Sequence, residues 1–276
     1  MNLKSIAALF AMLVAAQISF AETTSAKYTE ISNFRKINGA GKIAAKTFEG
    51  ENVIEATGVV NFRTDPLFAI DNKKIYKFSG DFKVTPDTKP AKFYFGIIYY
   101  DAAKRIISPE HILFVPGSLT EVVADAAKGA TVIKVKDASK WKKGAVYRLA
   151  LNAKADCSDL PNRNIIYNIK NIEQKDGAWE ITFSKGIPCE VKTGTIVREQ
   201  HTGSSYSYSM TGATVIPADW KNYSALIKGE SRSGRMSFSN FWPGAKFVSF
   251  IVLGNNGGSK TSAFMLRNFT IEEITR

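Results

Sequence analysis

Apolar side chains recur at every second position along most of this chain, and that period constrains the fold more than any other feature. In Ile75–Val84 (IYKFSGDFKV), Tyr76, Phe78 and Phe82 alternate with polar residues. Side chains of an extended strand point alternately to its two faces, so this segment predicts a half-buried strand. No later stretch of ten or more residues has the 3.6-residue period of an amphipathic helix. The pattern predicts an all-β protein.

Six further segments are predicted to be strands, and residues that favour turns lie between them. The segments are Val53–Phe62, Lys92–Tyr100, Tyr206–Met210, Tyr223–Lys228, Phe247–Leu253 and Ala263–Glu272. The intervening turns are rich in Pro, Gly, Asn and Asp, as in the NNGG sequence at 255–258. Short strands with regular turns and no helices are typical of a β-sandwich.

The segment Lys92–Tyr100 (KFYFGIIYY) differs from the others because both of its faces are apolar. One face carries Phe93, Phe95, Ile97 and Tyr99, and the other carries Tyr94, Gly96, Ile98 and Tyr100. We expect the first face to lie in the core. The second face is either an exposed platform for a ligand or a surface covered by more of the chain, and the sequence leaves both open.

The middle of the chain predicts a separate small domain. Ala-rich, turn-rich spacers alternate there with short strands at Thr131–Val135, Ala145–Leu151, Asn164–Ile172, Trp179–Phe183 and Thr195–Glu199. We interpret residues 118–199 as a small β-barrel inserted into a loop of a jelly-roll β-sandwich, which residues 22–117 and 200–276 form.

The first residues, MNLKSIAALFAMLVAAQISFAET, have the layout of a secretory signal peptide. Lys4 precedes the apolar run Ile6–Ile18, which is too short to span a bilayer. Small residues follow, with Ala21 immediately before Glu22. We therefore expect residues 1–21 to be removed and the chain to be exported to the periplasm or the extracellular space.

Export would place the two cysteines, Cys157 and Cys189, in an oxidising compartment. In an oxidising compartment they would join as a disulfide, and both lie in the 118–199 segment, whose small core would gain from a cross-link. The alternative is two separate thiols.

The charge balance is basic, with 37 Lys and Arg against 25 Asp and Glu. The basic residues are scattered and no nucleic-acid-binding motif accompanies them, so we do not expect a nucleic-acid partner. A balance of this sign favours acidic glycans or an anionic cell surface, and the alternative is a set of ordinary solvated lysines.

Two stretches, Tyr76–Tyr100 and Ser262–Ile274 (SAFMLRNFTIEEI), resemble the jelly-roll carbohydrate-binding modules of bacterial glycosidases. In such modules an early Y-x-F-S-G-x-F-K strand starts the sandwich. The last strand often has a phrase like f-x-i-d-n-v-x-i. Arg267 stands where these modules more often have Asp, and this departure argues against a calcium site at the final strand.

Within the middle segment, Lys128–Ala150 and Ile181–Glu199 are similar to small β-domains of polysaccharide-processing and phage tail proteins. The shared pattern is a G-x-T-x-I-x-V strand, a W/F-x-x-G turn and a later G-T-x-V strand. The whole arrangement resembles uncharacterised exported proteins of polysaccharide-degrading bacteria. These resemblances imply carbohydrate binding by a β-sandwich.

Aromatic residues are the candidate ligand-binding residues, because a flat ring can stack on the apolar C–H face of a sugar. The candidates are Tyr94, Tyr100, Tyr206, Tyr208, Trp220 and Trp242. In SSYSYSM, Tyr206 and Tyr208 share one face with serines opposite, which would suit one wall of a site. The alternative for each aromatic residue is a place in the core.

The sequence also contains candidate residues for a metal site and a catalytic site. His111 and His201 flank the predicted insert and could bind a metal with Glu110 or Glu199, or serve as polar residues at a domain junction. Candidate acids for glycoside hydrolysis are Asp101, Glu110 and Asp219, each of which could equally be a turn residue.

The sequence therefore predicts non-catalytic binding of a polysaccharide or a cell-surface glycan, with no cofactor and no metal. One alternative is a structural or adhesive protein that contacts other proteins. The other is a polysaccharide hydrolase or lyase at the domain junction.

Overall fold

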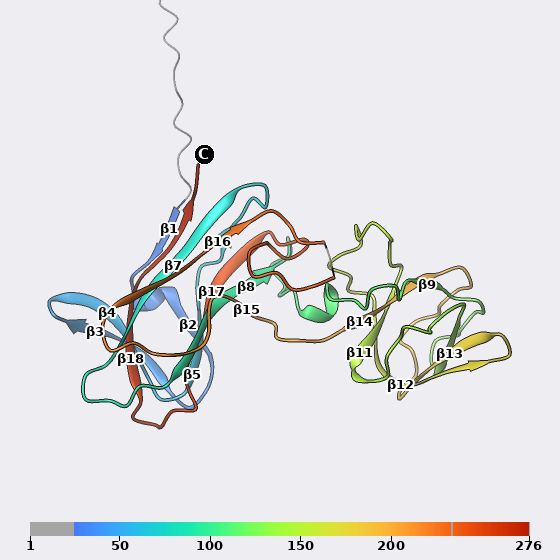
Figure 1. Ribbon diagram of the computed structural model, residues 1–276, viewed down its shortest axis with the longest axis horizontal. Helices are drawn as coiled ribbons and strands as arrows, with labels where there is room; N and C mark the ends of the chain where they lie inside the picture. Colours follow the sequence, from blue (N-terminus) through green and yellow to red (C-terminus); the bar gives the residue numbers. More distant parts are fainter. Residues whose placement is uncertain (1–24, 233, 276) are drawn as a thin grey trace, which may run out of the picture.

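The computed structural model describes residues 25–232 and 234–275 and contains three six-stranded sheets (Figure 1). Every strand pairing between the named strands is antiparallel. Two 3-10 helices, η1 (Ile31–Asn33) and η2 (Pro109–His111), are the helical elements of the described residues. The predicted signal peptide, residues 1–21, lies outside them.

Two of the sheets form a sandwich. Sheet A has the order β16 (Lys221–Lys228), β7 (Ile75–Val84), β18 (Ala263–Glu273), β4 (Glu51–Thr57) and β3 (Lys42–Phe48), with β1 (Ser25–Tyr28) paired to β18. Sheet B has the order β15 (Ser207–Val215), β8 (Lys92–Tyr100), β17 (Phe247–Asn256), β5 (Val60–Thr64) and β2 (Phe34–Asn38), with β6 (Phe68–Ala69) paired to β17. The chain crosses repeatedly between these sheets, which is the connectivity of a jelly roll. The predicted all-β sandwich is confirmed.

The core of the sandwich is rich in aromatic side chains. Phe82 of β7 lies 4.6 Å from Phe93 and 4.9 Å from Phe95 of β8, measured between ring centroids. Phe250 of β17 lies 5.2 Å from Phe269 of β18. Along β7, β8 and β17 these inward side chains come from alternate positions, as the two-residue period of a strand requires, and they pack the two sheets together.

One predicted strand is two strands. Val53–Phe62 contains the end of β4 and the start of β5, which belong to opposite sheets. Gly58 lies between them with φ of 69°. This left-handed backbone conformation suits glycine and permits the turn that carries the chain from sheet A to sheet B.

Sheet C is built from the middle of the chain, in the order β10 (Val132–Val135), β13 (Ala178–Phe183), β12 (Ile165–Lys175), β11 (Gly144–Leu151), β14 (Ile196–His201) and β9 (Thr120–Glu121). Val123 N–H donates to the Lys134 carbonyl and Lys136 N–H donates to the Glu121 carbonyl, both at 2.9 Å. These bonds join the β9 end of the sheet to β10, its opposite edge. Sheet C encloses a hydrophobic cluster of its own, separate from that of the sandwich. The domain boundaries at 117/118 and 199/200 stay a prediction.

The predicted disulfide is wrong, because Cys157 and Cys189 are both free thiols in this structure. Cys157 lies in the loop between β11 and β12, where its Sγ is 4.0 Å from a guanidinium nitrogen of Arg198. Cys189 is exposed in the segment between β13 and β14. The two residues belong to different loops of sheet C, which the strand pairing holds without a cross-link.

Sheet C lies beside one end of the sandwich (Figure 1), and polar contacts join the two. Arg163 forms an ion pair of 2.9 Å with Asp101, at the end of β8. Asn162 N–H donates to the His111 carbonyl at 2.8 Å. Among the described residues, no helix is long and apolar enough to cross a membrane.

Candidate functional site

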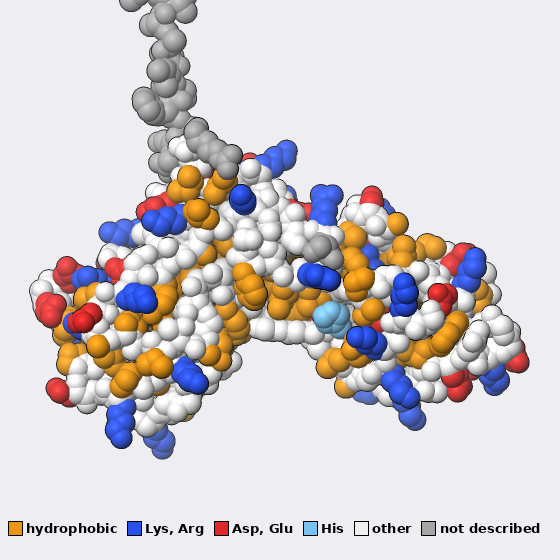
Figure 2. All heavy atoms as spheres, in the orientation of Figure 1, with side chains coloured by type: hydrophobic (Ala, Val, Ile, Leu, Met, Phe, Trp, Pro, Cys, Tyr) orange, Lys and Arg blue, Asp and Glu red, His pale blue; other side chains and the backbone are white. Residues whose placement is uncertain are grey.

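The two faces of β8 have different surroundings. Phe93, Phe95, Ile97 and Tyr99 are completely buried between sheets A and B. The opposite side chains therefore lie on the outer face of sheet B, which faces away from sheet A. Neighbouring strands place further apolar side chains there, including Ile251 of β17. In Figure 2, hydrophobic side chains gather over the middle of the molecule, where Figure 1 shows β8, β15 and β17.

Three tyrosines form a cluster on this face, and we call Tyr94, Tyr206 and Tyr208 the tyrosine surface. The Tyr94 and Tyr208 rings, from β8 and β15, lie 4.9 Å apart between centroids with planes inclined at 49°. Tyr206 and Tyr208 lie 6.4 Å apart. All three are half-buried, so each ring packs on one side and is open to solvent on another.

Part of the outer face is covered by the sandwich itself. Ile98 and Ile251 are buried there in a small cluster with Tyr100. The partly buried side chains packed against this cluster are Leu67, Tyr206, Phe247 and Leu253, and none comes from sheet C. The second apolar face of KFYFGIIYY is therefore partly core and partly surface. The tyrosine surface forms its exposed part.

Gly96 determines how closely β15 approaches this site. A Cβ atom at Gly96 would lie 2.1 Å from the Ser207 carbonyl oxygen and 2.8 Å from the Tyr208 Cα, and real structures do not have contacts that short. The absence of a side chain at this position lets β15 lie against β8 and places Tyr208 beside Tyr94.

The alternation predicted for SSYSYSM matches the structure. Ser207 is buried, and its hydroxyl lies 2.9 Å from that of Ser209. Both serines approach the buried Tyr99, whose pKa is raised by burial. The tyrosines point the other way. Burial also raises the pKa of Tyr206, with smaller contributions from Tyr208 and Tyr100.

The remaining aromatic candidates lie elsewhere or are inaccessible. Trp242 has no exposed surface and packs 5.0 Å from Tyr99 in the core, so its assignment to a ligand is wrong. Tyr100 is also buried, and its hydroxyl lies 3.2 Å from that of Ser249. Trp220 lies beside sheet A, with the Arg267 guanidinium 4.2 Å from its ring centroid. Of the six candidates, the structure brings Tyr94, Tyr206 and Tyr208 together at the surface.

The histidines are used in local hydrogen bonds. His111 Nδ1 accepts from the Ser108 N–H at 3.1 Å, within the turn that includes η2. His201 Nδ1 lies 3.2 Å from the Thr202 carbonyl, and Glu110 accepts from the Thr202 hydroxyl. In the part of the chain that the structure describes, no group of three or more His, Cys, Asp or Glu side chains is placed to hold a metal ion.

Asp101 organises a turn and an interface. Its Oδ1 accepts the N–H groups of Ala103 and Arg105 at 2.9 and 3.0 Å, and its Oδ2 pairs with Arg105 and Arg163. Burial acts to raise the Asp101 pKa, but the hydrogen bonds and charges of the two arginines outweigh it and lower the pKa. An acid held in the ionised form by two arginines is poorly suited to donate a proton. Asp219, the other turn candidate, is exposed in the loop before β16.

The Glu199 carboxyl group is buried, and the sequence around it does not indicate this. The residue is completely buried near the end of β14, where Oε1 accepts the Lys142 N–H at 2.7 Å. Oε2 has no hydrogen-bond partner among the described residues. Burial raises the pKa of Glu199 to about 7. Since water does not reach it, the carboxyl group is a structural feature of the junction rather than an acid in an open cleft.

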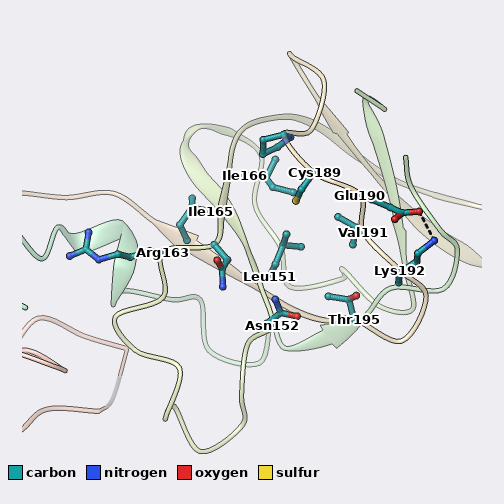
Figure 3. Close-up of a pocket in the computed structure, with 12 residues that line it drawn as sticks. Leu151, Asn152, Arg163, Ile165, Ile166, Cys189, Glu190, Val191, Lys192 and Thr195 are labelled. Carbon is teal, nitrogen blue, oxygen red and sulfur yellow. Dashed lines mark hydrogen bonds and ion pairs between the residues drawn. The ribbon is translucent and has the colours of Figure 1, made fainter. Parts of the chain in front are cut away.

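A cavity of about 380 Å³ lies in sheet C, away from the tyrosine surface (Figure 3). Its lining includes the apolar side chains of Leu151, Ile166 and Val191 and the exposed Cys189. Glu190 and Lys192 form an ion pair at one side. The lining combines hydrophobic and charged groups but contains no acid–base pair or nucleophile–base pair of a catalytic site.

No protein-family model matches the sequence, and no curated protein matches it. Solved structures with remote similarity include the following three. The CBM22-1 xylan-binding domain from Paenibacillus barcinonensis Xyn10C is 8% identical, with 92% of this chain and 94% of that chain covered and a TM-score of 0.38.

The second structure is the arabinose-bound MgGH51 α-L-arabinofuranosidase, at 10% identity, with 92% of this chain and 25% of that chain covered and a TM-score of 0.30. The third is the CBM22-1-CBM22-2 tandem domain of the same Xyn10C, at 10% identity, with 91% and 97% covered and a TM-score of 0.22. At these identities and TM-scores the likeness supports no conclusion about this chain.

Proposed function

We propose that this protein binds a polysaccharide without cleaving it, as an exported protein, and that the tyrosine surface is its binding site. The observation that carries the proposal is the pair Tyr94 and Tyr208, whose half-buried rings lie 4.9 Å apart on adjacent strands. Rings that are held by the sheet need little further ordering when a ligand stacks on them, so less conformational entropy is lost on binding.

The surrounding chemistry supports a sugar ligand. Phenol hydroxyl groups at the ring edges can donate and accept hydrogen bonds, while the ring faces are apolar. A sugar has the complementary combination of hydroxyl groups and C–H faces. Ile98 and Ile251 fill the buried cluster next to the tyrosine surface, so the tyrosine side chains cannot occupy that space.

Affinity electrophoresis of the purified protein in gels that contain a panel of polysaccharides tests this proposal. We expect retardation by at least one polysaccharide, and its loss in Tyr94→Ala and Tyr208→Ala. The matched control is Tyr167→Ala, which removes an exposed tyrosine from β12 of sheet C. Thermal unfolding of each variant checks that the fold is kept.

Two outcomes would contradict the proposal. One is that no polysaccharide of a broad panel retards the protein, together with concentration-dependent assembly on a sizing column, which would favour a structural or adhesive role. The other is that Tyr167→Ala weakens retardation as much as Tyr208→Ala does.

A further inference from the structure

The six strands of sheet B contain no acidic residue. They contain four basic ones, Arg35, Lys36, Arg63 and Lys92. Sheet A differs, since its strands contain Asp81, Glu51, Glu55, Glu272 and Glu273. The sheet that carries the tyrosine surface is therefore the one that has only positive side-chain charge in its strands.

Two of these cations lie on the outer face of sheet B. Phe34 and Phe62 are buried in the core, so the next residues along β2 and β5, Arg35 and Arg63, point outward. The strand register places Arg35 directly opposite Arg63. It also places Arg63 opposite Ile251 of β17.

This register continues to the tyrosine surface. Ile251 is opposite Gly96 of β8, and Gly96 lies against Tyr208 of β15. A single row on the outer face therefore joins Tyr208 to Arg35 across five strands. Four interstrand spacings of about 4.8 Å make the row about 19 Å long. The Arg63 guanidinium carbon also lies 6.0 Å from the ring centroid of Tyr100, in the small buried cluster of the same face.

The two arginines are only partly neutralised. Arg63 lies 3.8 Å from Asp65, at the outer limit of an ion pair, and donates to the Thr64 carbonyl at 3.3 Å. Arg35 is exposed and makes no ion pair with any described residue. Like charges directly opposite each other in a sheet are destabilising, and an anion that contacts both would relieve their repulsion.

The planar guanidinium group binds carboxylate and sulfate groups through parallel N–H donors. The tyrosine rings lie at one end of the row and the arginines at the other. This arrangement is complementary to a polymer whose sugar rings carry anionic groups. Building on the proposed function, we infer that the ligand is an acidic polysaccharide. One sugar ring stacks on the tyrosine surface, and the carboxylate or sulfate of a nearby sugar contacts Arg35 and Arg63.

Affinity electrophoresis tests this inference with four gels: polygalacturonate, its carboxyl-reduced neutral form, a sulfated galactan and a neutral galactan. We expect an acidic polymer to bind more tightly than its neutral counterpart. Comparison of the two acidic gels distinguishes carboxylate from sulfate. In Arg35→Gln, affinity for the preferred acidic polymer should fall about tenfold, with affinity for neutral polymers unchanged.

The control is Lys228→Gln, which removes one positive charge from an exposed position on β16 of sheet A. Equal weakening in Lys228→Gln and Arg35→Gln would mean that net charge alone attracts the polymer, and would overturn the inference. Binding of a neutral polymer that depends on Tyr208, without preference for acidic ones, would also overturn it and leave the proposed function standing. Absence of binding to every polymer would overturn both.

Discussion

Arg198 of β14 donates to Asp159 across 2.7 Å, and both side chains are almost completely shielded from water, with 3% and 5% exposed. The same aspartate accepts from the Asn162 side chain and the Lys154 N–H. The Arg198 guanidinium lies 4.5 Å from the ring centroid of Phe114. This buried ion pair therefore holds the β11–β12 loop against β14. Through Phe114, the Arg198 side chain also contacts the segment that precedes β9.

We expect Asp159→Ala to destabilise the protein by about 3–5 kcal/mol, because the Arg198 charge would stay buried without a partner. Urea denaturation measures the free energy of unfolding. The control is Glu190→Ala, which breaks an ion pair with Lys192 that water surrounds. Its loss should be much smaller, since solvent screens that pair. Equal losses in the two variants would contradict the importance of the buried pair.

The pH dependence of stability should contain a contribution from Glu199. Its pKa is raised by burial from 4.5 to about 7, so the folded state holds a proton that the unfolded state releases between these values. Stability from this group is therefore fully present below about pH 4.5, falls as pH rises to about 7, and is constant above. The expected total loss is about 3 kcal/mol.

Glu199→Gln isolates this contribution, because the amide oxygen can still accept the Lys142 N–H. Between pH 5 and pH 8 the variant should gain about 2–3 kcal/mol in stability relative to the parent protein. Thermal or urea unfolding at both pH values gives the difference. A difference between the two proteins that does not change with pH would show that Glu199 keeps an ordinary pKa.

Trp242→Ala should destabilise the sandwich by about 3–5 kcal/mol, the usual cost of emptying a large aromatic site in a core. The tryptophan is completely buried against Tyr99. Trp220→Ala, on the half-exposed side chain beside Arg267, should cost less. Unfolding midpoints in urea rank the two variants, and the reverse order would contradict the burial of Trp242.

The two cysteines should be free thiols in the purified protein. Without reductant, thiol titration under denaturing conditions should detect both, and in the folded protein the exposed Cys189 should react before Cys157. Cys189→Ser should change stability by less than about 0.5 kcal/mol, as surface substitutions usually do. If no thiol were titratable in the denatured chain, Cys157 and Cys189 would be joined in a disulfide, contrary to this structure.

The candidate site could be predicted in part. The alternation in SSYSYSM correctly separates Tyr206 and Tyr208 from the serines, since this property depends only on the period of an extended strand. The contact between Tyr94 and Tyr208 depends on which strands pair, and these residues are far apart in sequence. The burial of Trp242 cannot be predicted from the sequence, because a tryptophan in a turn-rich segment has no local signal of burial.

The sequence by itself determined strands β7 and β8 and their inward faces, because side-chain alternation is a local consequence of backbone geometry. The bounds of β7 and β8 match the predicted segments, and their buried aromatic residues are the expected ones. Only the tertiary structure decided what lies over the second face of KFYFGIIYY and which charges stand near it. Strand order and register place Gly96, Ile251 and the two arginines in one row, and Tyr208 lies against Gly96; these contacts depend on packing between distant segments.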